Sequence, residues 1–244
     1  MATRNITIIQ YIEKSRPRRF IGEVVGTFLL VSIAMAASLS DAITGFGGEP
    51  ARLLGPGLTV MAVILATGNI SGAHLNPVVT LAFFLRGEFP AKRIGDYIFG
   101  QLIGGLAGGL FVRFALASGK VIGLTQIGHV AIWQAILVEV VATFFLVSVI
   151  LGTASGSQNV GPLSALAVGG TIIVDTVVFA PFSGASMNPV RSLAAEIVDN
   201  NYLHFYIYLI GPLMGSLIAV GVAYALRGGG HDPVASQAAQ GKLE

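Results

Sequence analysis

Two copies of one short motif hold the residues of this chain that are best suited to chemistry. Residues 71–78 read Ser-Gly-Ala-His-Leu-Asn-Pro-Val, and residues 183–190 read Ser-Gly-Ala-Ser-Met-Asn-Pro-Val, with Arg191 directly after the second copy. Each copy follows a long apolar run. Polar backbone at membrane depth is tolerated only where it is buried in protein or lines a water-filled cavity. The pair therefore predicts a pore or a binding site where two repeats meet.

The side chains of the motifs suit the control of ions at a pore. Asn76 and Asn188 would cap short helices that begin at Pro77 and Pro189. The positive ends of two such helices oppose a cation, and a water oxygen that accepts from both amides cannot continue a proton-hopping wire. Arg191 lies on the same helix face as Asn188 and would repel cations and donate hydrogen bonds. The alternatives are that the asparagines only cap helices and that Arg191 only reaches the membrane interface.

The composition places the chain in a membrane. It is 54% hydrophobic and 11% charged, with a mean hydropathy of +0.78, whereas a soluble domain has about a quarter charged residues. The chain has no cysteine, which excludes disulfides and thiolate metal sites. Its 244 residues leave room for six spans of about 20 residues.

Apolar runs and the two motifs predict an all-α membrane protein. The six predicted spans are residues 20–39, 54–70, 94–117, 131–152, 163–180 and 203–226. The runs 77–85 and 189–197 are too short to cross a bilayer, so we expect re-entrant half-helices there. Residues 1–19 and 227–244 flank this single channel-like domain of residues 20–226, and the polar tail 227–244 is predicted to be disordered.

The two halves, about residues 20–117 and 131–226, repeat each other. Residues 22–31 match 138–147, and residues 97–104 match 208–215. Each half contributes three full spans, an odd number, so the second half must be inserted upside down relative to the first. The half-helices then enter from opposite faces and meet near the midplane.

Basic residues predict the orientation. Ten of them fall on one side: Arg4, Lys14, Arg16, Arg18, Arg19, Arg86, Lys92, Arg93, Arg227 and Lys242. The positive-inside rule makes that side cytoplasmic. We therefore expect a multi-pass membrane protein with both termini in the cytoplasm, and the short tail favours a bacterial inner membrane.

Together these residues resemble the aquaporin, or major intrinsic protein, family over about residues 20–226. The second loop is most similar to the nodulin-like intrinsic proteins of plants and their bacterial relatives. The resemblance implies a passive channel for water and small uncharged solutes, such as glycerol or metalloid hydroxides, closed to ions and protons. It also implies a homotetramer with one pore per subunit. The family's usual signature is Asn-Pro-Ala, and here Val78 and Val190 replace both alanines.

The resemblance also implies a selectivity filter. Beside Arg191, it places Pro56, Thr176 and Ala185 at the filter by their spacing from the Asn-Pro motifs. A water-strict member is expected to have a phenylalanine and a histidine at the first two of these positions. This chain has no ring at any of the three, which predicts a wide and moderately polar constriction. The kink at Pro56 leaves Gly55, Gly57 or Leu58 as alternative lining residues.

Two carboxylates lie in apolar segments. The resemblance gives Glu23 and Glu139 a structural role, in which each accepts backbone N–H groups of one re-entrant loop. Proton coupling in a transporter is the alternative. His74 is expected to pack within the first loop, with pH sensing as the other interpretation. Asp175 either faces the pore or lies against a neighbouring helix.

Other function classes stay open from the sequence. A secondary transporter would also have inverted repeats and a midplane site, although ion coupling favours a titratable group where this chain has two neutral asparagines. A junction protein on the same scaffold would carry no flux, and a water-selective pore is the alternative within channels. The motifs contain no nucleophile–base pair, metal-ligand cluster or phosphate loop. We therefore expect no enzymatic activity and no cofactor, and we expect water, small neutral solutes and lipid as partners rather than nucleic acid.

Overall fold

The computed structural model describes residues 8–44, 48–116, 123–155 and 163–241, which form helices and no strands. Arg4 and Lys242 lie outside this part of the chain. The first half comprises α1 (Ile8–Thr44), α2 (Gly48–Ser71), α3 (Pro77–Leu85), a 3-10 turn (Ala91–Arg93) and α4 (Ile94–Phe111), which ends in a π-turn (Val112–Leu116). The second half comprises α5 (Ile132–Ala154), α6 (Leu163–Ser183), α7 (Pro189–Asp199) and α8 (Phe205–Arg227), and α9 (Pro233–Gln240) follows.

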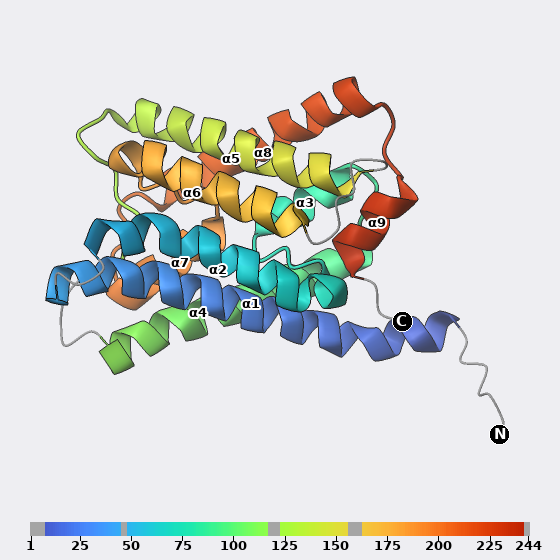
Figure 1. Ribbon diagram of the computed structural model, residues 1–244, viewed down its shortest axis with the longest axis horizontal. Coiled ribbons are helices and arrows are strands. Elements are labelled where there is room, and N and C mark those ends of the chain that lie inside the picture. The colour runs from blue at the N-terminus through green and yellow to red at the C-terminus, as the bar shows by residue number, and fades with distance from the viewer. Residues whose placement is uncertain (1–7, 45–47, 117–122, 156–162, 242–244) are drawn as a thin grey trace.

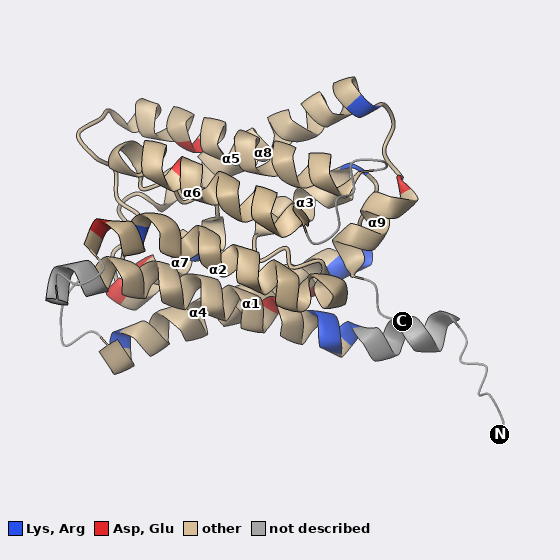
Figure 2. Ribbon diagram, in the orientation of Figure 1, with Lys and Arg blue, Asp and Glu red and all other residues tan. Residues whose placement is uncertain are grey.

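All six predicted spans are confirmed. Within the described residues, α1, α2, α4, α5, α6 and α8 are long and apolar enough to cross a membrane. The largest differences from the predicted boundaries are at two helix starts: α1 begins at Ile8 and continues through Pro17, and α2 begins at Gly48. Charged residues are scarce along the middle of these helices and gather toward the ends of the bundle, as Figure 2 shows.

The halves run in opposite directions. In Figure 1, α1 and α5 lie roughly parallel to the long axis of the bundle, and the colour gradient shows that they point opposite ways. The pairs α1–α4 and α5–α8 pack closely in equivalent fashion. A Cβ at Gly104 would lie 2.2 Å from Val24 O, and a Cβ at Gly215 would lie 2.3 Å from Val140 O. These contacts let the helix backbones approach each other as the small-xxx-small pattern predicts.

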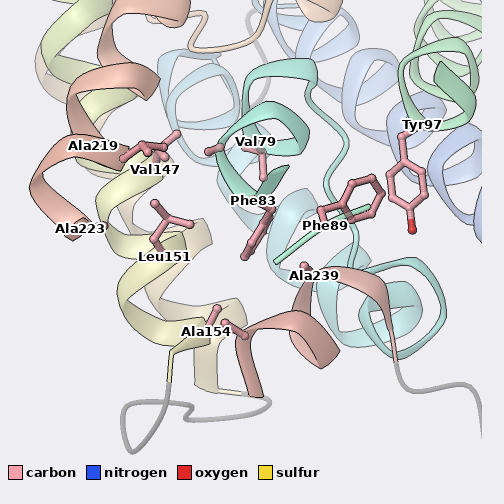
Figure 3. Packing of buried hydrophobic residues seen from close by; sticks show 13 residues of the cluster. Val79, Phe83, Phe89, Tyr97, Val147, Leu151, Ala154, Ala219, Ala223 and Ala239 are labelled. Atoms are coloured by element: carbon pink, nitrogen blue, oxygen red, sulfur yellow. The ribbon is translucent and has the colours of Figure 1, made fainter. Parts of the chain in front are cut away.

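The predicted disordered tail is the main difference from the sequence analysis. Asp232 caps α9 by accepting a hydrogen bond from Val234 N at 2.8 Å, and Pro233 occupies its first turn. Ala235 and Ala239 are fully buried in a cluster that includes Phe83 and Phe89 (Figure 3). The alanines share one helix face because they are four residues apart. The tail looks polar as a sequence, but its folding depends on an apolar surface supplied by α3 and α5.

Candidate functional site

The first Asn-Pro loop is held by the buried carboxylate of Glu23. Its Oε1 accepts hydrogen bonds from Ser71 Oγ at 2.8 Å and His74 N at 3.0 Å, and its Oε2 accepts from Leu75 N at 2.8 Å. Leu75 and the residue two before it have φ of 55° and 49°, a left-handed conformation that is strained for residues other than glycine. Successive N–H groups in such a segment converge on an anion, so the carboxylate stabilises the strained loop.

The second loop repeats this arrangement around Glu139. The carboxylate accepts hydrogen bonds at 2.8 Å from Ser183 Oγ, Ser186 N and Met187 N. Met187 and the residue two before it have φ of 53° and 46°. Tyr208 donates to Ser183 O at 2.8 Å, as Tyr97 does to the equivalent carbonyl of the first loop at 2.6 Å. Both loops are therefore built by the same contacts in inverted orientation.

The carboxylates differ in one donor. Gln101 Nε2 donates to Glu23 Oε2 at 2.8 Å, whereas the matching position of the second half is Pro212, which has no side-chain donor. Asp175 lies near Glu139 and is buried, with no hydrogen-bond partner for either oxygen among the described residues. It does not line the cavity, which favours the second of the two positions expected for it.

Hydrogen bonds join the two loops at their tips. Asn76 Nδ2 donates to Met187 O at 2.7 Å, and Asn188 Nδ2 donates to Leu75 O at 2.8 Å. Each asparagine also caps its own half-helix, because Oδ1 accepts from Val78 N at 3.1 Å and from Val190 N at 3.0 Å, respectively. One amide hydrogen of each asparagine is thus used structurally, and the second is left for another acceptor.

Both asparagines line a cavity of about 650 Å³. Pro56, Thr176, Ala185 and Arg191, the four filter residues predicted from the sequence, line the same cavity, as does His74. Gly55, Gly57 and Leu58, the alternatives to Pro56, do not. Pro77, Val78, Pro189 and Val190 also lie outside its lining, as do both glutamates. The valines that replace the usual alanines therefore add bulk behind the tips.

The polar groups at the filter differ in their freedom to bind a solute. Thr176 Oγ1 donates to Ile172 O of its own helix at 2.6 Å, so only its lone pairs remain to accept. Arg191 Nη1 has no hydrogen-bond partner in the described part of the chain. Arg191 lines the cavity, and its guanidinium places a positive charge at the cavity wall.

His74 is packed as well as lining the cavity. Its ring stacks on Phe83 with centroids 5.0 Å apart, and Nδ1 lies 3.0 Å from Thr80 Oγ1. The ring also lies close to the Ala239 carbonyl of α9. These contacts agree with the expectation that His74 packs within the first loop.

The sequence analysis missed two groups of lining residues. Gln126 belongs to the segment before α5 and lies against Gly184, and its neighbour Thr125 is within 2.6 Å of Ser192 Oγ. Gln237 and Ala238 come from α9. No periodicity or motif marks either segment, since each reaches the cavity only through the fold.

This geometry defines a class of protein. The chain has two oppositely directed helical repeats, and each contributes one half-helix. The capped N-termini of the two half-helices meet beside a cavity, which is the arrangement of a multi-pass membrane channel. The chain belongs to the major intrinsic protein family, the aquaporins: the family "Major intrinsic protein" matches residues 10–224. It is a channel for water and small neutral solutes, and the members of its family are channels rather than enzymes.

Known proteins with similar sequences are plant aquaporins. The chain is 35% identical over 207 residues to Aquaporin NIP1-1 of Zea mays, covering 82% of this chain and 71% of that protein. It is 36% identical over 214 residues to Putative aquaporin NIP4-1 of Arabidopsis thaliana, covering 86% and 74%. Its structure is similar to that of the aquaglyceroporin from Plasmodium falciparum, with a TM-score of 0.75 and 27% identity over 87% of this chain and 96% of that one. These relatives support the predicted closeness to nodulin-like proteins and give no support to the expected bacterial inner membrane.

Proposed function

We propose that the four cavity residues Pro56, Thr176, Ala185 and Arg191 form a filter wide enough for glycerol-sized neutral solutes or metalloid hydroxides as well as water. The observation that carries this proposal is the absence of an aromatic or imidazole ring from all four positions, which line one cavity. Small side chains leave room for a solute with several heavy atoms.

The hydrogen-bonding groups suit a hydroxylated solute. The guanidinium of Arg191 supplies a cationic donor at the cavity. Thr176 supplies an acceptor, because its hydroxyl hydrogen is already bonded to Ile172 O. A polyol or a metalloid hydroxide has both donors and acceptors on adjacent atoms and can use both groups. An ion would lose its hydration shell without gaining comparable partners, because the lining is mostly apolar.

The midplane pair is proposed to exclude ions and protons. Asn76 and Asn188 each stand at the N-terminus of a half-helix, where the helix dipole is positive. The carbonyls of Met187 and Leu75 orient the two amides, so a passing water oxygen meets donors on both sides. That arrangement interrupts a continuous proton wire.

The orientation and assembly are part of the same proposal. We place both termini in the cytoplasm, because basic residues gather at the end of the bundle that carries α9: Arg19 and Arg93 bond to Gln240, and Arg86 bonds to Gly228 O. The exposed apolar side chains on the outer helices suit lipid or neighbouring subunits, such as Phe99 and Leu166 at 60% and 56% exposure. By its family, the chain is proposed to form a homotetramer with one pore in each subunit.

Stopped-flow light scattering on proteoliposomes tests the filter. A glycerol gradient should give fast shrinkage followed by reswelling that is faster than in empty liposomes. The double variant Thr176→His with Pro56→Phe should suppress the reswelling and keep part of the water flux, because two rings narrow the constriction. Shrinkage without accelerated reswelling in the wild-type protein would mean a water-selective pore. Unchanged glycerol flux in the folded double variant would mean that the constriction lies elsewhere.

A further inference from the structure

The C-terminal helix α9 lies against one end of the pore cavity. It occupies the end of the bundle beside α2 and α3 (Figure 1). Gln237 and Ala238 line the cavity together with Gly72 and Phe83. We call this end the α9 mouth. A Cβ at Gly72 would lie 2.4 Å from Ala239 O, so the backbone of α9 directly contacts the first Asn-Pro loop.

A glycine-rich linker connects α8 to α9. Between α8 and α9 stand Gly228, Gly229 and Gly230. Gly228 has a φ of 73°, and nothing lies within 4 Å of a Cβ built on Gly228 or Gly229. Gly228 and Gly229 are free of packing and make a flexible hinge, whereas Gly230 fits directly against Arg86 O. The ends of α9 are well defined, with the cap at Asp232 and the helix stop at Gly241.

The docked helix is held by a small apolar face and by hydrogen bonds from two arginines. Its buried face consists of Ala235 and Ala239, and methyl groups bury little apolar area. Its far end is fixed by Gln240, whose carbonyl accepts from Arg19 Nε at 2.7 Å and whose Oε1 accepts from Arg93 Nη1 at 2.8 Å. A helix of eight residues is not stable alone in water, so α9 should unfold when it leaves this site.

The docking site also contains a buried carboxylate, Glu88, which is ion-paired with Arg86. Glu88 is 1% exposed, and neither carboxylate oxygen has a hydrogen-bond partner among the described residues. Its nearest cation, Arg86 Nε, is 3.7 Å away, and Asp232 adds a second negative charge at the start of α9. The two carboxylates repel each other when both are ionised. This repulsion offsets part of the free energy that favours docking.

We propose that α9 is a lid on the α9 mouth, hinged at residues 228–230, whose docked position narrows the pore and whose release raises its permeability. Water flux is the readout, so the outcome does not depend on which solutes the filter admits. Channel permeability scales with the open fraction of the population.

A cysteine pair tests the lid in the full-length chain, which has no native cysteine. Ala154 of α5 and Ala235 of α9 belong to the same buried cluster. The variant Ala154→Cys with Ala235→Cys is reconstituted in liposomes and measured by stopped flow before oxidation, after oxidation and after reduction. We expect oxidation to lower the water permeability per channel and reduction to restore it. The single variant Ala235→Cys, treated identically, is the matched control.

A truncation gives the opposite perturbation. The chain ended after Arg227 lacks hinge and lid, and we expect its water permeability per channel to rise by about twofold or more. Size-exclusion chromatography and thermal melting in detergent establish that the shortened chain is folded. If it does not fold, the cysteine pair decides alone. Equal permeability of the oxidised and reduced pair overturns the lid, and so does a folded truncation with wild-type permeability.

Discussion

At the residue scale, the two buried glutamates each hold one Asn-Pro loop, but they accept different numbers of hydrogen bonds. Glu23 accepts from four donors, namely Ser71, His74, Leu75 and Gln101, whereas Glu139 accepts from three in the described structure. A carboxylate is needed because every facing group is a donor. An amide of the same shape would direct its own N–H₂ at some of them.

The first prediction concerns these carboxylates. Glu23→Gln should destabilise the protein by about 1–3 kcal/mol for each buried donor left without an acceptor, and Glu139→Gln should do the same at the second loop. The measurement is the midpoint of thermal unfolding in detergent. Glu49→Gln is the control, since that exposed side chain only pairs with Arg52 at 3.2 Å. A Glu23→Gln midpoint equal to that of the control would remove the loop-supporting role.

The second prediction concerns Arg191. Its guanidinium lies at the cavity wall, so Arg191→Val removes a charge that repels cations. Unit charges about 4 Å apart interact by about 4 kcal/mol at an effective dielectric of 20, and about 1.4 kcal/mol of lost barrier is tenfold in rate. We expect sodium leak to rise about tenfold or more, measured with an ion-sensitive dye in proteoliposomes.

Arg113→Gln serves as the control for that leak, because Arg113 does not line the cavity. If Arg191→Val leaks no more sodium than the control, the helix dipoles at Asn76 and Asn188 are sufficient to exclude cations. Arg191 then acts only in solute binding.

At the element scale, glycine spacing sets how closely the helices pack. Gly104 on α4 and Gly215 on α8 press against the backbones of α1 and α5 at equivalent points of the two repeats. Small residues four apart along a helix allow such close approach. The helix ends were less predictable: α1 passes through Pro17, where the sequence favours a break.

The third prediction compares two glycines on α8. A Cβ at Gly215 would lie 2.3 Å from Val140 O, whereas a Cβ at Gly221 would have nothing within 4 Å. Gly215→Ala should therefore cost about 1–3 kcal/mol through overpacking, and Gly221→Ala should be neutral or stabilising by up to about 1 kcal/mol because alanine favours helix. Thermal melting of the two variants side by side is the measurement. Equal midpoints of thermal unfolding would show that α5 and α8 can move apart with little loss of stability.

At the scale of the whole molecule, the pore is assembled from parts that meet only in three dimensions. The tips of α3 and α7 exchange hydrogen bonds between side chains and carbonyls more than 100 residues apart. One end of the same cavity is lined by α9. A segment outside both repeats therefore contributes to the wall of the cavity.

The fourth prediction is a pH dependence of flux. Burial raises the pKa of Glu88 to about 7, with Arg86 opposing the rise and Asp232 adding to it. A raised pKa in the docked state means that docking is strongest below about pH 4.5, the ordinary value, and weakens as the pH rises through about 7. If α9 is a lid, water permeability should increase from pH 5 to pH 8 in stopped-flow measurements.

Glu88→Gln should remove that pH dependence, because glutamine has no proton to lose. His231 lies over Gly87 beside the same site, so His231→Gln is the control and should keep the response. A pH response that persists in Glu88→Gln would assign it to another group.

The sequence by itself determined the spans, the repeat, the family and the residues that meet at the cavity. It could do so because each rests on local information: apolar length for a helix, Asn-Pro for a capped half-helix, and the odd span count for inversion. Only the tertiary structure decided that residues 123–126 and α9 reach the cavity, that Asp175 faces away from it, and that the tail is helical. Those outcomes depend on surfaces distant in sequence, since the two alanines of α9 are buried only where Phe83, Phe89 and Ala154 supply a partner.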